Sequence, residues 1–151
     1  MPKYFDITLI AEQFEKSQTV IGDCLNSLGI YHGIKDETYF KGKIILFNYI
    51  ENETLSFDEI CISIEDLVFH QETFKYEIGM LTSLVTSVIN CIEEVQFALC
   101  SYELNGYLLS EINKIEDIND TLLSKFPIVY KHDRYSKSID MSINYTAQNL
   151  I

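Results

Sequence analysis

The sequence predicts an α+β fold, a two-layer sandwich with a mainly antiparallel sheet and one long central helix packed on one face. Two observations predict it. Segments with the two-residue alternation of strands follow one another across short turns, and the hydrophobic period changes to that of a helix from Thr73 to Ile92. The glycine-rich turns of a doubly wound parallel fold are absent, because the chain holds only six glycines.

Three segments of the first half have strand character. Residues 5–11 are rich in apolar side chains, and residues 43–50 are β-branched and aromatic. Residues 57–64 alternate, with Ile60, Ile62 and Ile64 on one face and Glu59, Cys61, Ser63 and Glu65 on the other. This alternation predicts one buried and one wet face, and the polar residues 51–54 indicate a hairpin turn.

Two helices are expected before residue 95. Ser17 is a plausible N-cap for a helix that ends at Gly29. The helix from Thr73 to Ile92 has a wide apolar stripe, which is typical of a central helix packed across a sheet. Its other side is polar and uncharged, with Thr82, Ser83, Thr86, Ser87 and Asn90.

The last third suggests a hairpin, a helix and a tail. A strand at 95–104 meets the turn Asn105-Gly106 and a return segment at 107–110. Apolar residues at helical spacing follow, namely Ile112, Ile115, Ile118 and Leu122, and Pro127 ends that helix. Residues 128–130 are expected to add an edge strand, and residues 136–151 a polar, loose C-terminal tail.

The chain length of 151 residues favours a single domain over residues 1–151. No signal peptide is recognisable, and no apolar run is long enough to span a membrane, so we expect a cytoplasmic protein. The four cysteines are widely spaced, without a CxxC pair. In a reducing cytosol they are expected to be free and to act as small buried hydrophobes.

No motif of catalysis, metal binding or phosphate binding is present, so no catalytic residue, metal ligand or cofactor is assigned. The three histidines are far apart, and His70 beside Glu72 is the one acid/base pair worth noting. Nucleic-acid binding is disfavoured. The basic cluster Lys125, Lys131, His132, Arg134 and Lys137 is interrupted by an acid, and we expect it to balance acids within the fold or to mark a mobile end.

The negative charge is concentrated in the middle of the chain. Residues 51–120 contain 15 acidic residues and two lysines, whereas the rest is close to neutral and the whole chain carries a net charge of −12. Such a field repels anionic membranes and attracts cationic partners. Several tyrosines, a residue enriched at interfaces, adjoin these acids.

In size, segregated charge and tyrosine content, the chain resembles the small acidic immunity proteins that protect bacteria from nuclease toxins, including those of contact-dependent inhibition. The resemblance implies a non-catalytic protein that occludes the active site of a cationic toxin. The residues expected to bind the partner are Glu51, Glu53, Asp58, Glu59, Glu65, Asp66, Glu93, Glu94, Tyr102, Glu103, Tyr107 and Glu111. Alternation places Glu59 and Glu65 together on the wet face of one strand, which makes them the best-supported pair.

Two alternatives stay open. A phage or bacterial assembly protein that forms homo-oligomers would use the acidic surface for solubility alone, with a self-contact through the uncharged side of the helix at 73–92. A small enzyme with an acid/base site at His70 is the third reading. The oligomeric state is not predicted.

Overall fold

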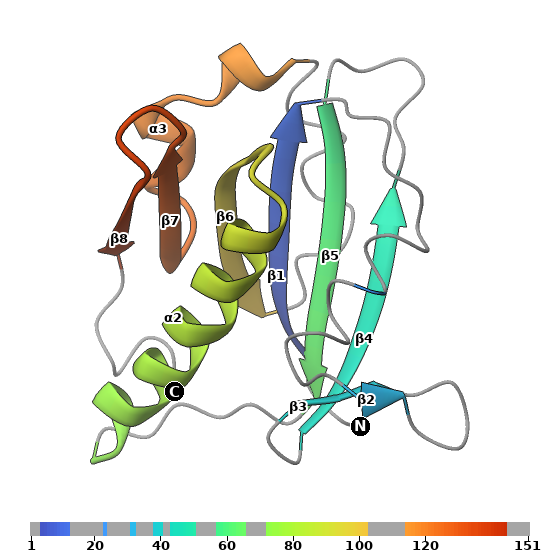
Figure 1. The fold of residues 1–151 in the computed structure, drawn as a ribbon. Coiled ribbons are helices and arrows are strands. Elements are labelled where there is room, and N and C mark those ends of the chain that lie inside the picture. The colour runs from blue at the N-terminus through green and yellow to red at the C-terminus, as the bar shows by residue number, and fades with distance from the viewer. Residues whose placement is uncertain are drawn as a thin grey trace.

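A computed structural model confirms the α+β class. It describes residues 4–12, 23, 31–32, 38–40, 43–50, 57–65, 72–102 and 114–144. Eight strands in this part form one antiparallel sheet in the order β2-β3-β4-β5-β1-β6-β7-β8 (Figure 1). The strands are β1 (Tyr4–Glu12), β2 (Tyr31–His32), β3 (Thr38–Phe40), β4 (Lys43–Ile50), β5 (Phe57–Glu65), β6 (Val95–Tyr102), β7 (Ile128–Asp133) and β8 (Ser138–Ile143).

The N-terminal strand β1 lies in the middle of the sheet. It pairs with β5 on one side and with β6 on the other, both antiparallel. Phe5, Ile7 and Leu9 face one side of the sheet, and Asp6, Thr8 and Ile10 face the other, and all six are buried. A strand covered on both faces reads as a continuous apolar run, which explains why its sequence shows little alternation.

The helix α2 (Phe74–Cys91) covers one face of the sheet, as Figure 1 shows. It buries the predicted stripe against β1, β5, β6 and β7, and Leu81, Val85 and Val88 are almost completely inaccessible. Each such side chain contributes about 1.5–3 kcal/mol relative to an exposed one. Tyr130 of β7 extends this layer, and its hydroxyl lies 2.8 Å from the hydroxyl of Thr82 on α2.

The opposite face is covered at its β6–β7 side by the segment between β6 and β7. This segment forms the 3₁₀ helix η2 (Ile115–Asp117) and the short helix α3 (Asp120–Leu123) instead of the single helix expected from the spacing of its apolar residues. Both helices contribute to a second apolar cluster, which contains Ile10, Phe57, Leu99, Ile115, Leu122, Leu123, Phe126 and Val129.

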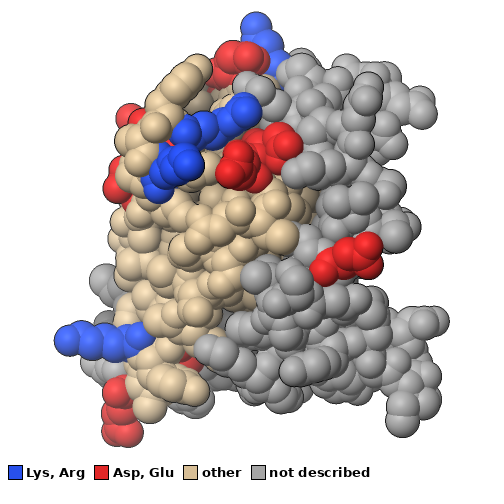
Figure 2. All heavy atoms as spheres, in the orientation of Figure 1, with Lys and Arg blue, Asp and Glu red and all other residues tan. Residues whose placement is uncertain are grey.

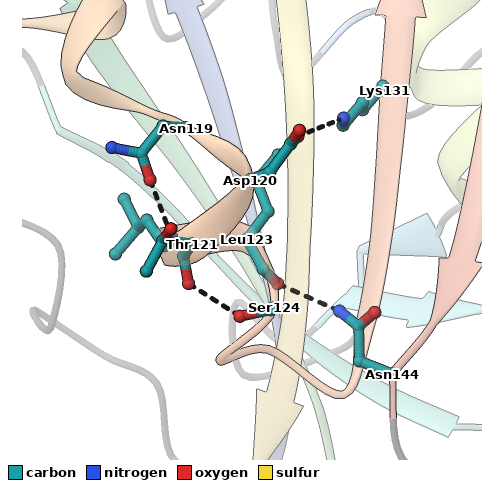
Figure 3. A network of polar contacts seen from close by, with 8 residues as sticks. Asn119, Asp120, Thr121, Leu123, Ser124, Lys131 and Asn144 are labelled. Atoms are coloured by element: carbon teal, nitrogen blue, oxygen red, sulfur yellow. Dashed lines mark hydrogen bonds and ion pairs between the residues drawn. The ribbon is translucent and has the colours of Figure 1, made fainter.

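The prediction of a loose tail from residue 136 is wrong for residues 138–143, because these form β8. Strand β8 pairs with β7 over its whole length, so β8 and not β7 is the edge strand. Its end is fixed by Asn144, whose side-chain amide donates to the carbonyl oxygens of Leu123 and Phe126 at 3.0 and 2.7 Å. Figure 3 shows the contact of Asn144 with Leu123 together with the ion pair of Lys131 and Asp120.

Several expected elements are confirmed, and others lie outside the described residues. Strands at 5–11, 43–50, 57–64 and 95–102 and the helix at 74–91 are present, and β4 and β5 pair as the expected hairpin requires. The turn at 51–54 and the hairpin at 105–110 are not described. The helix expected at 17–29 also lies outside, except for Asp23, which is helical and exposed.

Candidate functional site

A cleft of about 590 Å³ opens between the end of α2 and the hairpin that joins β7 to β8. A neighbouring hollow of about 400 Å³ lies along the same hairpin and shares four residues with the cleft. The cleft is lined by Ile89, Asn90, Glu93, Gln96, His132, Arg134, Tyr135 and Lys137.

The cleft exists because β6 and β7 separate near their ends. Their backbone pairing stops at Phe97 and Lys131. Gln96, which precedes Phe97 in β6, is an extra residue where the pairing with β1 is irregular. This extra residue is a β-bulge, and a β-bulge bends its strand. Beyond this point a side chain replaces the backbone ladder, because Nδ1 of His132 lies 2.9 Å from the carbonyl oxygen of Val95.

The hairpin tip has a defined structure. The carboxylate of Asp133 accepts hydrogen bonds from the backbone N–H groups of Tyr135 at 2.9 Å and of Ser136 at 3.4 Å. These bonds stabilise the ionised form and hold the pKa of Asp133 below its ordinary value. Lys137 closes the turn with a φ of 58°, in the left-handed region. Tyr135 is therefore presented on an ordered turn, with its side chain 100% exposed.

Both signs of charge line the cleft. Arg134 and Lys137 come from the hairpin, and Glu93 follows the end of α2. The amides of Asn90 and Gln96 add neutral donors and acceptors. A small ion of either sign would meet a like charge in this cleft, whereas a polypeptide surface with charges of both signs, backbone amides and apolar carbon suits such a lining.

The predicted partner-binding residues are only partly described. Glu51, Glu53, Asp66, Glu103, Tyr107 and Glu111 lie outside the described residues, and of Asp58 and Glu65 the structure describes the strand position alone. Glu93 is exposed and lines the cleft, and Glu94 beside it is half-buried. Tyr102 is half-buried and packs edge-on against Phe5, with ring centroids 5.1 Å apart, so its ring is part of the core layer.

The expectation that Glu59 lies on a wet face is wrong. Its side chain is 1% exposed, and within the described part of the chain its Oε1 has no hydrogen-bond partner. The alternation itself is confirmed, because Ile60, Ile62 and Ile64 all face α2. The prediction fails because the other face of β5, on which Glu59 lies, is also covered. Burial raises the pKa of Glu59 above 4.5, because the charged form loses its hydration.

Glu59 belongs to a buried polar row on β1 and β5. The register places Thr8 opposite Cys61 and Asp6 opposite Ser63, and both pairs are in contact through their side chains. Burial raises the pKa of Cys61 to about 11. Cys61 and Cys100 are free and buried, as expected, but Cys91 is disulfide-bonded to a partner outside the described residues, so the expectation of four free cysteines is wrong there.

The exposed charges of the described part nearly balance. Seven acidic and six basic residues are exposed in it. Figure 2 shows acidic and basic side chains side by side near the top of this face, and an area without charged side chains over α2. Buried and half-buried acids add to the exposed ones, so the described side chains comprise 12 acids and 6 bases, and the side chains that are not described carry the other half of the net charge of −12.

Composition alone does not predict where in the fold the basic cluster at 125–137 lies. The structure places Lys131, His132, Arg134 and Lys137 on the β7–β8 hairpin, three of them around the cleft. A signal for this hairpin is present in the sequence: Ile139, Met141 and Ile143 alternate with polar residues after the turn-forming run from Asp133 to Ser136.

Among the described residues, no group of three or more histidine, cysteine or acidic side chains is arranged to hold a metal ion. No helix in this part is long and apolar enough to cross a membrane. The chain matches no protein-family model, no curated protein and no solved structure.

Proposed function

We propose that this protein is a non-catalytic binding protein that recognises a basic protein partner, in the manner of a bacterial immunity protein that neutralises a cationic toxin. The observation that supports it best is the cleft at the β7–β8 hairpin. It combines a fully exposed tyrosine on an ordered turn with charged groups of both signs and with side-chain amides. Tyrosine on a rigid support provides a large contact area with little loss of conformational entropy on binding.

The net charge of −12 supports a basic partner. A partner with a positive surface is drawn to such a chain at long range, and the main effect is on the association rate. Glu93 stands at the cleft itself and is exposed. It therefore replaces the Glu59 and Glu65 pair as the acid whose reversal tests the interface, because reversing the buried Glu59 would test folding.

The experiment requires a defined partner. The neighbouring genes are first searched for a protein with a basic C-terminal domain, and the association of such a domain with this chain is then measured by stopped-flow fluorescence at several salt concentrations. Binding that slows with added salt supports the proposal. Absence of binding at micromolar concentrations of that domain contradicts it.

Two matched pairs of variants locate the contact. Tyr135→Ala should weaken binding at least tenfold, whereas Tyr76→Ala, at a tyrosine that is 72% exposed on the first turn of α2, should not change it. Glu93→Lys should slow association several-fold, and Glu116→Lys, an equal charge reversal at an exposed position that does not line the cleft, should have a smaller effect. Equal effects within each pair would exclude the cleft as the contact.

A further inference from the structure

Strand β8 presents an open sheet edge. It is the last strand of the sheet, and no strand of the described part pairs with its outer side. Figure 1 shows it as the outermost strand, beside β7. Its six residues are almost all exposed, and they include Met141 and Ile143, each 41% exposed. The opposite edge of the sheet is formed by β2, which has only two residues.

Protein sheets usually protect a long edge with charged side chains, above all lysine, or with proline, a bulge or a very short strand. Strand β8 has one charged side chain and none of the other features. Its sequence is Ser-Ile-Asp-Met-Ser-Ile, with Asp140 as the single charge, and its pairing with β7 runs without irregularity from Ser138 to Ile143. The strand is also held at both ends, by the Asp133 turn and by Asn144. It is therefore an ordered template for another strand.

We infer that β8 pairs antiparallel with β8 of a second copy of this chain, so that the two sheets continue into one across a two-fold axis. Such an axis is perpendicular to the sheet, so the rotation does not exchange the two faces of the sheet. Odd-numbered residues of β8 therefore pair with odd-numbered residues of the copy, and even-numbered residues with even-numbered ones. The odd-numbered residues Ile139 and Met141 face the α2 layer, where Met141 Sδ lies 3.6 Å from the hydroxyl of Thr82. Asp140 lies on the other face, along the hollow that contains Phe97. The axis must therefore lie midway between a residue of β8 and the same residue of the second copy, and it is named below by that residue.

One register is self-complementary. With the axis at Met141, this residue meets its own copy, Ile139 meets Ile143, and Asp140 meets Ser142, whose hydroxyl can donate to the carboxylate. Apolar pairs then lie on the α2 face and polar pairs on the other. With the axis at Asp140, two carboxylates face each other, which destabilises the pair. With the axis at Ser142, the overlap is shorter. The structure thus favours the axis at Met141, and this contact is independent of the proposed function.

Cysteine substitution tests the register directly. Residues directly opposite each other in an antiparallel pair have Cα atoms about 4.5–5.5 Å apart, within the Cα separation that a disulfide spans. Met141→Cys should cross-link into a covalent dimer under mild oxidation, whereas Asp140→Cys and Ser142→Cys should not. Cys61 and Cys100 do not interfere, because they are buried. A cross-link at position 140 or 142, or none at 141, would overturn the inference.

The mass in solution tests the pairing itself. Light scattering over a series of concentrations should give twice the monomer mass for the unmodified chain, and added salt should favour the dimer because it screens the repulsion between two chains of net charge −12. Met141→Lys places two like charges at the axis and should give a monomer. The control Thr121→Lys, at an exposed position of α3, should remain a dimer. Monomers at all concentrations for the unmodified chain would also refute the inference.

Discussion

His132 is joined to Val95 where the backbone ladder between β6 and β7 has already ended. Its Nδ1 lies 2.9 Å from the carbonyl oxygen of Val95, beyond the last pair of Phe97 with Lys131. A carbonyl oxygen only accepts, so Nδ1 is the protonated nitrogen of the ring, and Nε2 is the acceptor when the ring is neutral. This contact ties the base of the β7–β8 hairpin to β6, next to the cleft.

Replacing His132 by alanine should therefore loosen the hairpin more than the sheet. We expect His132→Ala to lower the free energy of unfolding by about 1–2 kcal/mol, since one hydrogen bond to a backbone carbonyl is lost together with some packing. Amide hydrogen exchange should accelerate at residues 131–139 and stay unchanged in β1. Urea unfolding and exchange mass spectrometry measure both effects. Uniform acceleration across the sheet would show that the histidine supports the whole core instead.

The contrast between Ile60 and Glu59 shows what a single strand reveals about its surroundings. Alternation assigned these two residues to opposite faces, and the register with β1 confirms it. Alternation carries no information about what covers the second face, because that depends on segments distant in sequence. The helices η2 and α3 are such segments. They bring Ile115 and Leu123 to the second face of the sheet, where both residues form an apolar layer with Phe57 of β5.

The helix α2 was easier to predict, since eighteen residues of period 3.6 leave little doubt about their buried side. The cleft could not be predicted in the same way. It depends on the point where β6 and β7 stop pairing, and on a bulge at Gln96, and neither has a signal in the local sequence. The exposed position of Tyr135 follows from a turn that Asp133 stabilises, and this turn is not among the elements predicted from the sequence.

The buried carboxyl of Glu59 predicts a pH dependence of stability. Its pKa is raised above 4.5 in the folded protein, so the folded state binds this proton more tightly than the unfolded chain does. The contribution to stability is present below pH 4.5 and is lost as the pH rises through the pKa of the folded state. Glu59→Gln keeps the shape without the charge, and should raise the free energy of unfolding at pH 7 by about 1 kcal/mol or more.

The measurement for Glu59→Gln is urea unfolding at a series of pH values from 4 to 8. The variant should lose less stability than the unmodified protein as the pH rises. Glu116→Gln, at an exposed position of η2, controls for the loss of one negative charge from the whole chain. If both variants changed the profile equally, net charge and not the burial of Glu59 would be the cause.

The cysteines predict a thiol count. The chain has four cysteines, of which Cys61 and Cys100 are free and buried and Cys91 is disulfide-bonded. A thiol reagent should react slowly with the native protein at pH 8, because burial raises the pKa of Cys61 to about 11 and raises that of Cys100 as well. In denaturant without reductant the count should be two, and after reduction four.

A count of four before reduction, in protein purified under air, would contradict the disulfide. Because disulfides persist in oxidising compartments, the same count made on freshly lysed cells tests the cytoplasmic location that is expected from the sequence.

Lys137 predicts opposite effects for two substitutions at one position. Its φ of 58° is a conformation that costs an L-residue about 1–2 kcal/mol and that glycine adopts without strain. Lys137→Gly should therefore leave stability unchanged or raise it by up to about 1 kcal/mol, since the relief of strain is partly offset by the greater freedom of glycine in the unfolded chain. Lys137→Val should lower stability by more than about 1 kcal/mol, because a β-branched side chain is least compatible with this region.

Thermal and urea unfolding of the two variants give the comparison, with Lys125→Gly and Lys125→Val at an exposed position outside the turn as controls. Equal losses for glycine and valine at position 137 would mean that the lysine side chain, and not the backbone conformation, stabilises the hairpin.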